Sequence, residues 1–255
     1  MTKEFGACIQ LLSRLPLPRW MTPDKAPDFT TCVRFFPLAG LVIALPATFV
    51  MALATVAGFS TMLTAALAMA TQVAVTGALH EDGLADCADG FGGGRERAEK
   101  LAIMKDSRVG AFGVIGLVLA LLVRFSALTA LLAGGLGPAL AAYLAAHVAS
   151  RAFQVAFWHS LPPARDHGLS YGLGLPGAYA TGLALSLGSA GALLLTLPAF
   201  DIRNIMIAAL SAVAVYVFFR RLCKAQIGGQ TGDTIGALHI LTEIAILAGL
   251  STLLP

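Results

Sequence analysis

Seven long apolar stretches divide this chain, and they limit its fold more than any other feature. A helix that crosses a bilayer needs about 20 mostly apolar residues, and only helices or closed barrels satisfy their backbone polar groups in lipid. Charged residues make up 12% of the chain, against about 25% in soluble domains. We find no alternating pattern long enough for a barrel strand. The sequence therefore predicts an all-α fold, a polytopic membrane helix bundle of about seven transmembrane helices, with residues 1–255 forming one domain. The predicted spans are 35–57, 60–80, 110–133, 137–158, 177–198, 205–219 and 235–254.

Basic residues in the connections predict how the bundle is oriented. They gather before the first span, between the second and third, and between the sixth and seventh, whereas the alternate connections hold only Arg203. Positively charged connections stay in the cytoplasm, so the N-terminus and every polar loop are expected on that side. Residues 1–34 are predicted to form an amphipathic helix at the membrane surface and then an irregular loop, with a solvated leader as the alternative. We expect no signal peptide and four free, reduced cysteines.

The most unusual polar segment runs from His80 to Gly110 and holds seven of the 14 acidic residues. Asp82, Asp86 and Asp89 have the spacing i, i+4 and i+7, which places them on one face of a helix. Carboxylates placed together repel one another unless a cation lies between them, and a site of oxygen ligands suits magnesium, manganese or calcium. We expect the second span to continue as a helix into this segment and to end at the glycines from Gly90. The alternative to a metal site is a solvated loop whose acidic and basic residues balance one another.

Further candidate groups follow the three aspartates. Asp106 is a candidate fourth metal ligand. Lys105 and Arg108, together with Arg97, are candidate substrate-binding residues, because lysine and arginine pair with phosphate oxygens and arginine can do so with two hydrogen bonds.

Two more polar loops lie near the ends of later spans. In GGQTGD at 228–233, backbone N–H groups such as those at Gly229 and Thr231 can hold an anion at the start of a helix. Asp233 has three alternative roles: metal ligand, partner of a sugar hydroxyl, or N-cap of the helix. The loop at 162–170 carries Arg165, Asp166 and His167 and is predicted to be an exposed turn.

Three charged side chains lie inside the predicted spans. Intramembrane ionisable groups are usually paired or line a polar cavity. At a rise of about 1.5 Å per residue, Arg151 and Glu243 lie at similar depths, so we expect them to pair. Arg124 lies deeper and has no obvious partner.

Several motifs resemble those of one enzyme family. They are LHEDGLADCADGFGGG at 79–94, RAEKLAIMKDSRVGAFG at 97–113 and GGQTGDTIGA at 228–237, with RLPLP at 14–18 and FPLAG at 36–40. They closely resemble the adenosylcobinamide-GDP ribazoletransferases, the cobalamin synthases of bacteria. The resemblance implies a multi-pass enzyme of the bacterial inner membrane that depends on Mg²⁺ or Mn²⁺. It also implies a distant similarity to CDP-alcohol phosphotransferases, of whose motif this chain keeps only Asp86-x-x-Asp89-Gly90.

The activity implied by the resemblance is the last step of adenosylcobalamin biosynthesis. Adenosylcobinamide phosphate passes from adenosylcobinamide-GDP to α-ribazole or its 5′-phosphate, and GMP is released. Metal ions held by Asp82, Asp86 and Asp89 would orient a direct in-line attack, and a carboxylate of this cluster or Asp233 would accept the hydroxyl proton.

The expected partners are these two substrates, the lipid bilayer and a second copy of the chain. The net charge of +3 gives no reason to expect nucleic acid. The alternatives are another membrane phosphotransferase of the CDP-alcohol type and, less favoured, a cation transporter.

Overall fold

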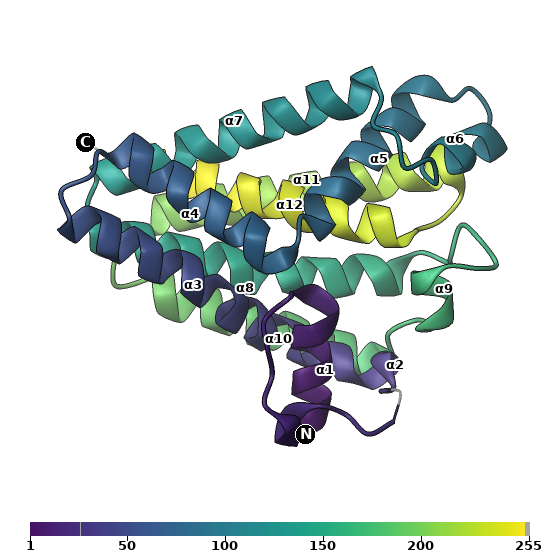
Figure 1. Ribbon diagram of the computed structural model, residues 1–255, viewed down its shortest axis with the longest axis horizontal. Helices are drawn as coiled ribbons and strands as arrows, with labels where there is room; N and C mark the ends of the chain where they lie inside the picture. The colour runs from purple at the N-terminus through teal and green to yellow at the C-terminus, as the bar shows by residue number, and fades with distance from the viewer. Residues whose placement is uncertain (26, 253–255) are drawn as a thin grey trace.

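The computed structural model describes residues 1–25 and 27–252, and its long helices run side by side along the molecule (Figure 1). Each of the seven predicted spans coincides with one of them, although the last two residues of the stretch 235–254 lie outside the described part. The helices are α3 (Phe36–Val56), α4 (Thr61–Thr76), α7 (Ala111–Ala133), α8 (Leu136–Ser160), α10 (Ala178–Thr196), α11 (Ile202–Ile227) and α12 (Gly232–Leu250). The prediction of a polytopic helical bundle is confirmed.

Five segments are long and apolar enough to cross a membrane by themselves. They are α7, α10, α11, α12 and the stretch Phe29–Val56, which joins α2 (Phe29–Cys32), η2 (Val33–Phe35) and α3. A sixth crossing is possible if α4 and α5 (Leu79–Gly93) are taken together. The helix α8 is long but falls short of this apolarity, because His147, Arg151 and Gln154 interrupt it. All three are buried against neighbouring helices, and α8 packs mainly on α3, α10 and α12.

The second span does not continue straight into the acidic segment, so that prediction is wrong. The helix α4 ends at Thr76, Gly77 and Ala78 both adopt left-handed backbone conformations (φ 64° and 58°), and α5 then leaves at 89° to α4. Glycine takes such a conformation without strain, and the two residues together make the corner. The acidic segment is therefore a separate helix, and it packs against α12 and α7.

Of two predicted helix ends, one agrees with the structure and one differs. The helix α5 ends at Gly93 with Gly94 as its C-cap, within the run of glycines predicted to end it. Gly90 also serves packing, because a side chain there would collide with Met104, which follows α6 (Arg97–Ile103). The helix α11 extends to Ile227, eight residues past the predicted span 205–219, because its basic last turns remain helical beyond the apolar part.

The N-terminal segment begins with the predicted helix, α1 (Thr2–Leu12), which lies across the long helices (Figure 1). It buries Cys8, Ile9 and Leu12 on one side, as expected of an amphipathic helix, and an irregular loop with the short turn η1 (Arg19–Met21) follows. All four cysteines are free and buried.

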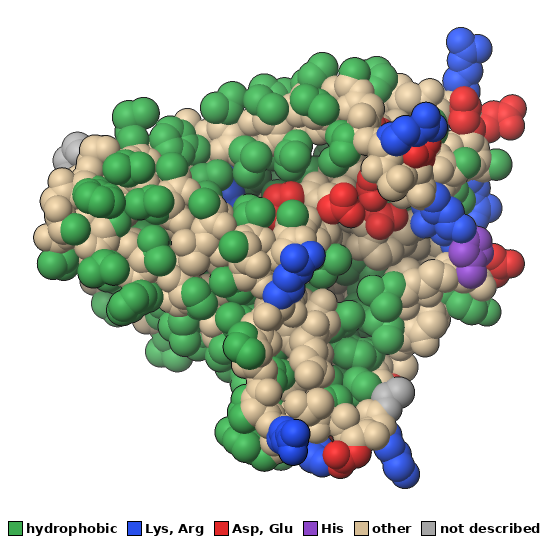
Figure 2. All heavy atoms as spheres, viewed as in Figure 1, with side chains coloured by type: hydrophobic (Ala, Val, Ile, Leu, Met, Phe, Trp, Pro, Cys, Tyr) green, Lys and Arg blue, Asp and Glu red, His purple; other side chains and the backbone are tan. Residues whose placement is uncertain are grey.

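Apolar and charged side chains occupy different regions of the face shown in Figure 2. Apolar side chains cover the end where α3 and α4 meet. Charged ones gather at the opposite end, near α5 and α6, and around the N-terminus. The candidate functional residues therefore share one end of the bundle.

Candidate functional site

The centre of the candidate site is the contact between α5 and the first turn of α12. A Cβ atom at Gly83 would lie only 2.7 Å from the carbonyl oxygen of Asp233, so the absence of a side chain at Gly83 allows the two helices to touch. This contact places Asp233 beside the acidic face of α5, where the charges of Asp82, Asp89 and Asp233 all repel that of Asp86. Asp82 is exposed, whereas Asp86 and Asp233 are half-buried.

Asp89, the third aspartate of the predicted set, has a structural role in this arrangement. Its two carboxylate oxygens accept hydrogen bonds from the backbone N–H groups of Gly110, at 2.7 Å, and Gly113, at 2.8 Å. The side chain is buried and satisfies free donors at the start of α7. Each oxygen keeps a second lone pair, so its role as a metal ligand stays a prediction.

Asp106 and Arg108 pair with each other at the surface. The Arg108 guanidinium donates to both Asp106 oxygens, with the closest contact at 2.6 Å from Nη2 to Oδ2. These bonds lower the pKa of Asp106 to about 2. The Arg108 side chain is 87% exposed, and neither residue lines the cavity described below. The pairing argues against a fourth ligand at Asp106, whose role as a metal ligand stays a prediction.

The two later polar loops pair with each other, which the sequence did not predict. The Gln230 N–H donates to the Pro162 carbonyl at 2.9 Å, and the Ala164 N–H donates to the Gln230 carbonyl at 2.8 Å. A Cβ at Gly229 would lie 2.3 Å from the Pro162 oxygen, so this glycine is explained by close packing of the two loops. Its predicted contact with substrate stays a prediction.

Thr231, not Asp233, caps α12. Its hydroxyl accepts from the Thr234 N–H at 3.3 Å and the Thr234 hydroxyl accepts from the Thr231 N–H at 2.8 Å, a reciprocal capping box. The Thr231 hydroxyl also lies 3.2 Å from the Asp233 carboxylate, to which it donates. The N-cap alternative for Asp233 is therefore wrong, and its carboxylate faces the site.

Arg165 was missed at the sequence level, where its loop was predicted to be an exposed turn. Its side chain is only 13% exposed, and its Nη1 lies 3.8 Å from Asp233 Oδ2. Its Nη2 donates to the Leu101 carbonyl, while Arg97 donates to the Ala164 carbonyl, each at 2.9 Å. These bonds hold α6 against the loop. A single arginine in a loop that contains proline and glycine does not by itself indicate a contact with Asp233 or with α6.

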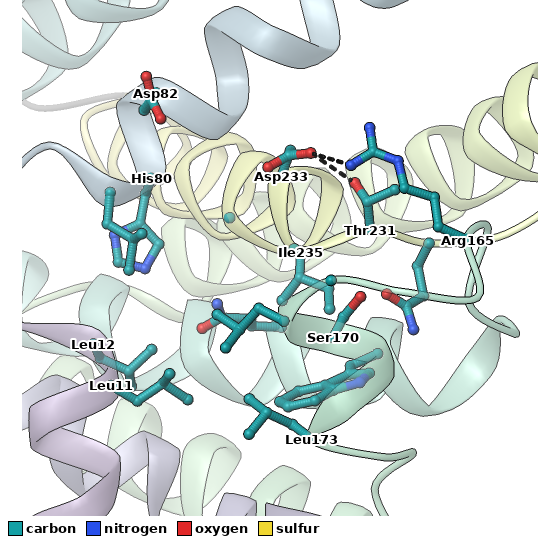
Figure 3. Close-up of a pocket in the computed structure, with 18 of the residues that line it drawn as sticks. Leu11, Leu12, His80, Asp82, Arg165, Ser170, Leu173, Thr231, Asp233 and Ile235 are labelled. Carbon is teal, nitrogen blue, oxygen red and sulfur yellow. Dashed lines mark hydrogen bonds and ion pairs between the residues drawn. The ribbon is translucent and has the colours of Figure 1, made fainter. Parts of the chain in front are cut away.

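A cavity of about 190 Å³ opens beside these groups (Figure 3). Asp82, Asp233 and Arg165 line its polar side, and leucines from α1 and from the segment around α9 (Leu169–Gly172) line the other. A second, broader groove adjoins it and shares Arg165 and His167. Arg97 and Lys105 line this groove, and the Lys105 ammonium contacts His167.

A second polar cluster lies deeper in the bundle, and it corrects the predicted ion pair. Arg124, expected to be alone, lies 2.7 Å from Glu243 and 3.4 Å from Glu81. Arg151 instead donates to His80 Nε2 at 2.7 Å and to Gln154 at 2.8 Å. The predicted depth was wrong for Arg124, whose guanidinium lies at the level of Glu243. Depth also does not tell which face of a helix a side chain occupies, and the bend before α5 brings Glu81 inward.

The deeper cluster is balanced in charge. It holds two guanidinium groups and two carboxylates, of which Arg124 contacts both carboxylates, while His147 and His239 lie 3.6 and 3.8 Å from Glu243. It separates two apolar core clusters.

Comparison with known proteins agrees with these features. A family model described as cobalamin-5-phosphate synthase matches residues 4–251. Relatives named adenosylcobinamide-GDP ribazoletransferase include one from Sinorhizobium medicae, 43% identical over 97% of this chain and 95% of its own length. Others come from Mesorhizobium japonicum, 42% identical over 96% and 91%, and Azorhizobium caulinodans, 41% identical over 96% and 94%. No solved structure matches. Because the family model and these relatives cover nearly the whole length, the chain belongs to the cobalamin-5-phosphate synthase family.

Proposed function

We propose that this protein is a metal-dependent membrane transferase that joins adenosylcobinamide-GDP to α-ribazole or α-ribazole 5′-phosphate and releases GMP. The observation that supports this most is that Asp82, Asp86 and Asp233 lie near one another at one end of the bundle, with Arg165 as the nearby cation. The names of the relatives supply the substrates.

The donor set of the cluster fits a hard divalent cation. It offers carboxylate oxygens and no sulfur or imidazole ligand, which suits Mg²⁺ or Mn²⁺. Asp86 and Asp233 are half-buried with like charges around them, and Arg165 at 3.8 Å offsets only part of that repulsion. Asp82, Asp86 and Asp233 would hold the ion, with Asp89 as a further candidate. When bound, the ion neutralises charge on the diphosphate oxygens.

The proposed reaction is a single displacement at phosphorus. A ribose hydroxyl of the acceptor forms a bond to the phosphorus attached to cobinamide, and the bond from that phosphorus to the GMP oxygen breaks with its electron pair on GMP. Asp233 or another carboxylate of the cluster takes the hydroxyl proton. Arg165, Arg97 and Lys105, which line the adjoining groove, would hold the donor phosphates.

The orientation proposed for the protein follows from the same end of the bundle. The loops that form the site also carry the basic connections of the chain, so we place this end and the N-terminus in the cytoplasm, within the bacterial inner membrane. The deeper acidic residues do not favour a cation transporter, because Glu81 and Glu243 both lie against Arg124.

The test is GMP release from adenosylcobinamide-GDP and α-ribazole by the purified protein in lipid or detergent. We expect activity with Mg²⁺, loss with a chelator, and loss in Asp86→Asn, while Asp201→Asn, an exposed acid before α11, serves as the control. Activity that survives chelation and Asp86→Asn would contradict the metal mechanism. Transfer from CDP-diacylglycerol with no GMP release from adenosylcobinamide-GDP would instead support the CDP-alcohol alternative.

A further inference from the structure

The cavity beside the acidic cluster has two chemically different sides. Its polar side carries Asp82 and Asp233, whereas Leu11, Leu12 and Leu173 stand on the opposite side (Figure 3). The apolar side is assembled from α1 and the α9 segment, which lie far apart in the sequence. The acidic cluster needs no such side for a metal or a phosphate, so the apolar side is suited to another part of a substrate.

Two buried polar side chains of the cavity have no hydrogen-bond partner among the described residues. They are the indole N–H of Trp158 and the side-chain amide of Gln230, of which neither atom is paired. The two residues are 3% and 0% exposed. An unpaired polar group in the interior costs roughly 1–3 kcal/mol, and a ligand that pairs with these groups removes that cost. The cavity therefore suits a ligand with an apolar face toward the leucines and a hydrogen-bonding atom toward these groups.

We propose that this cavity binds the aromatic base of the nucleoside acceptor, with the ribose directed toward Asp82 and Asp233. This inference rests on the proposed function and assigns a binding site to the acceptor, one of its two substrates. The base of α-ribazole is a dimethylbenzimidazole, a flat ring that offers methyl groups to the leucines and a single free ring nitrogen to the Trp158 N–H or the Gln230 amide.

Size and polarity exclude the other groups of the two substrates. The cavity, at about 190 Å³, is smaller than the roughly 300–1,000 Å³ of sites for drug-sized ligands, so a corrin macrocycle does not fit. Guanine carries polar atoms along most of its edge, and those that face Leu11, Leu12 and Leu173 would be left unpaired. The compact base that remains is the one on the acceptor.

Trp158 itself provides a direct test. The chain has two tryptophans, and Trp20 is 65% exposed at η1, so Trp20→Phe leaves Trp158 as the only one. We expect α-ribazole, added without the donor, to change the fluorescence of this variant with a saturable dependence, and guanosine or GMP to leave it unchanged. A matching response to guanosine, or none to α-ribazole at concentrations that saturate GMP release, would overturn the proposal.

A variant of the apolar side adds an independent readout. Leu173→Phe inserts extra volume and is expected to weaken α-ribazole binding about tenfold or more, raising KM for the acceptor but not for adenosylcobinamide-GDP. Leu175→Phe is the matched control, because Leu175 is close in sequence, exposed and outside the cavity lining. Equal effects on both KM values would contradict the assignment.

The two hypotheses can fail separately. GMP release that saturates with α-ribazole in a protein whose Trp158 does not respond would refute the cavity assignment and leave the proposed function standing. Absence of GMP release with any ribazole acceptor would refute the function itself.

Discussion

Gly83→Ala tests whether the contact between α5 and α12 controls the chemistry. The added Cβ would lie 2.7 Å from the Asp233 carbonyl oxygen, whereas ordinary contacts begin near 3.4 Å. The obstacle is backbone, so the first turn of α12 must move by about 0.7 Å, the difference between those distances. A misplacement of about 1 Å in an active site costs up to about 100-fold in rate. We therefore expect kcat to fall roughly 10- to 100-fold.

Stability is expected to change less than activity. Overpacking costs about 1–3 kcal/mol, but alanine is favoured over glycine within a helix by about 1 kcal/mol. The assay is GMP release at saturating substrates, with Tm measured in the same detergent. Gly93→Ala is the matched control on the same helix, since its Cβ would meet only Ile103 Cδ1 at an ordinary 3.5 Å. Nearly full activity in Gly83→Ala, or an equal loss in Gly93→Ala, would refute the reasoning.

Two further predictions concern stability. Arg124→Met leaves the Glu81 and Glu243 carboxylates without their closest cation and should lower the free energy of unfolding by about 3–5 kcal/mol. Denaturation in detergent measures this loss, and the same substitution in a Glu243→Met background should cost clearly less. Additive losses from the two substitutions would disprove the pair. Asp89→Ala removes two hydrogen bonds to the start of α7 and should lower the free energy of unfolding by about 1–3 kcal/mol. In the same denaturation assay, Asp106→Ala, at the surface, should change it by no more than about 0.5 kcal/mol. Equal losses in the two variants would contradict the capping role of Asp89.

Much of the candidate site could be recognised from local spacing. The interval between Asp82 and Asp86 is a helical repeat, and the segment did form a helix, with Asp82 lining one cavity together with Asp233 and with Asp86 near Asp233. The same spacing suggested one role for Asp89, but its carboxylate is engaged by Gly110 and Gly113. Periodicity predicts the direction of a side chain and does not tell which backbone will stand opposite it.

Contacts across long sequence intervals could not be predicted. Arg165 reaches Asp233 only because the loops at 162–170 and 228–233 share backbone hydrogen bonds. Arg124 reaches Glu81 because the chain turns sharply at Gly77 and Ala78. Neither the pairing of the two loops nor the turn at Gly77 and Ala78 can be recognised in the sequence, because single glycines occur in many loops that make no such contact.

The amino-acid sequence by itself determined that this chain forms long membrane helices and that its carboxylates concentrate in one of the segments between them. This is so because in lipid each helix must satisfy its own backbone polar groups, which makes helix formation a local property of about 20 residues. The tertiary structure alone decided which carboxylates meet, which arginine neutralises Glu243, and where a cavity opens. Those outcomes depend on the rotation of each helix and on how closely a glycine such as Gly83 lets two backbones approach.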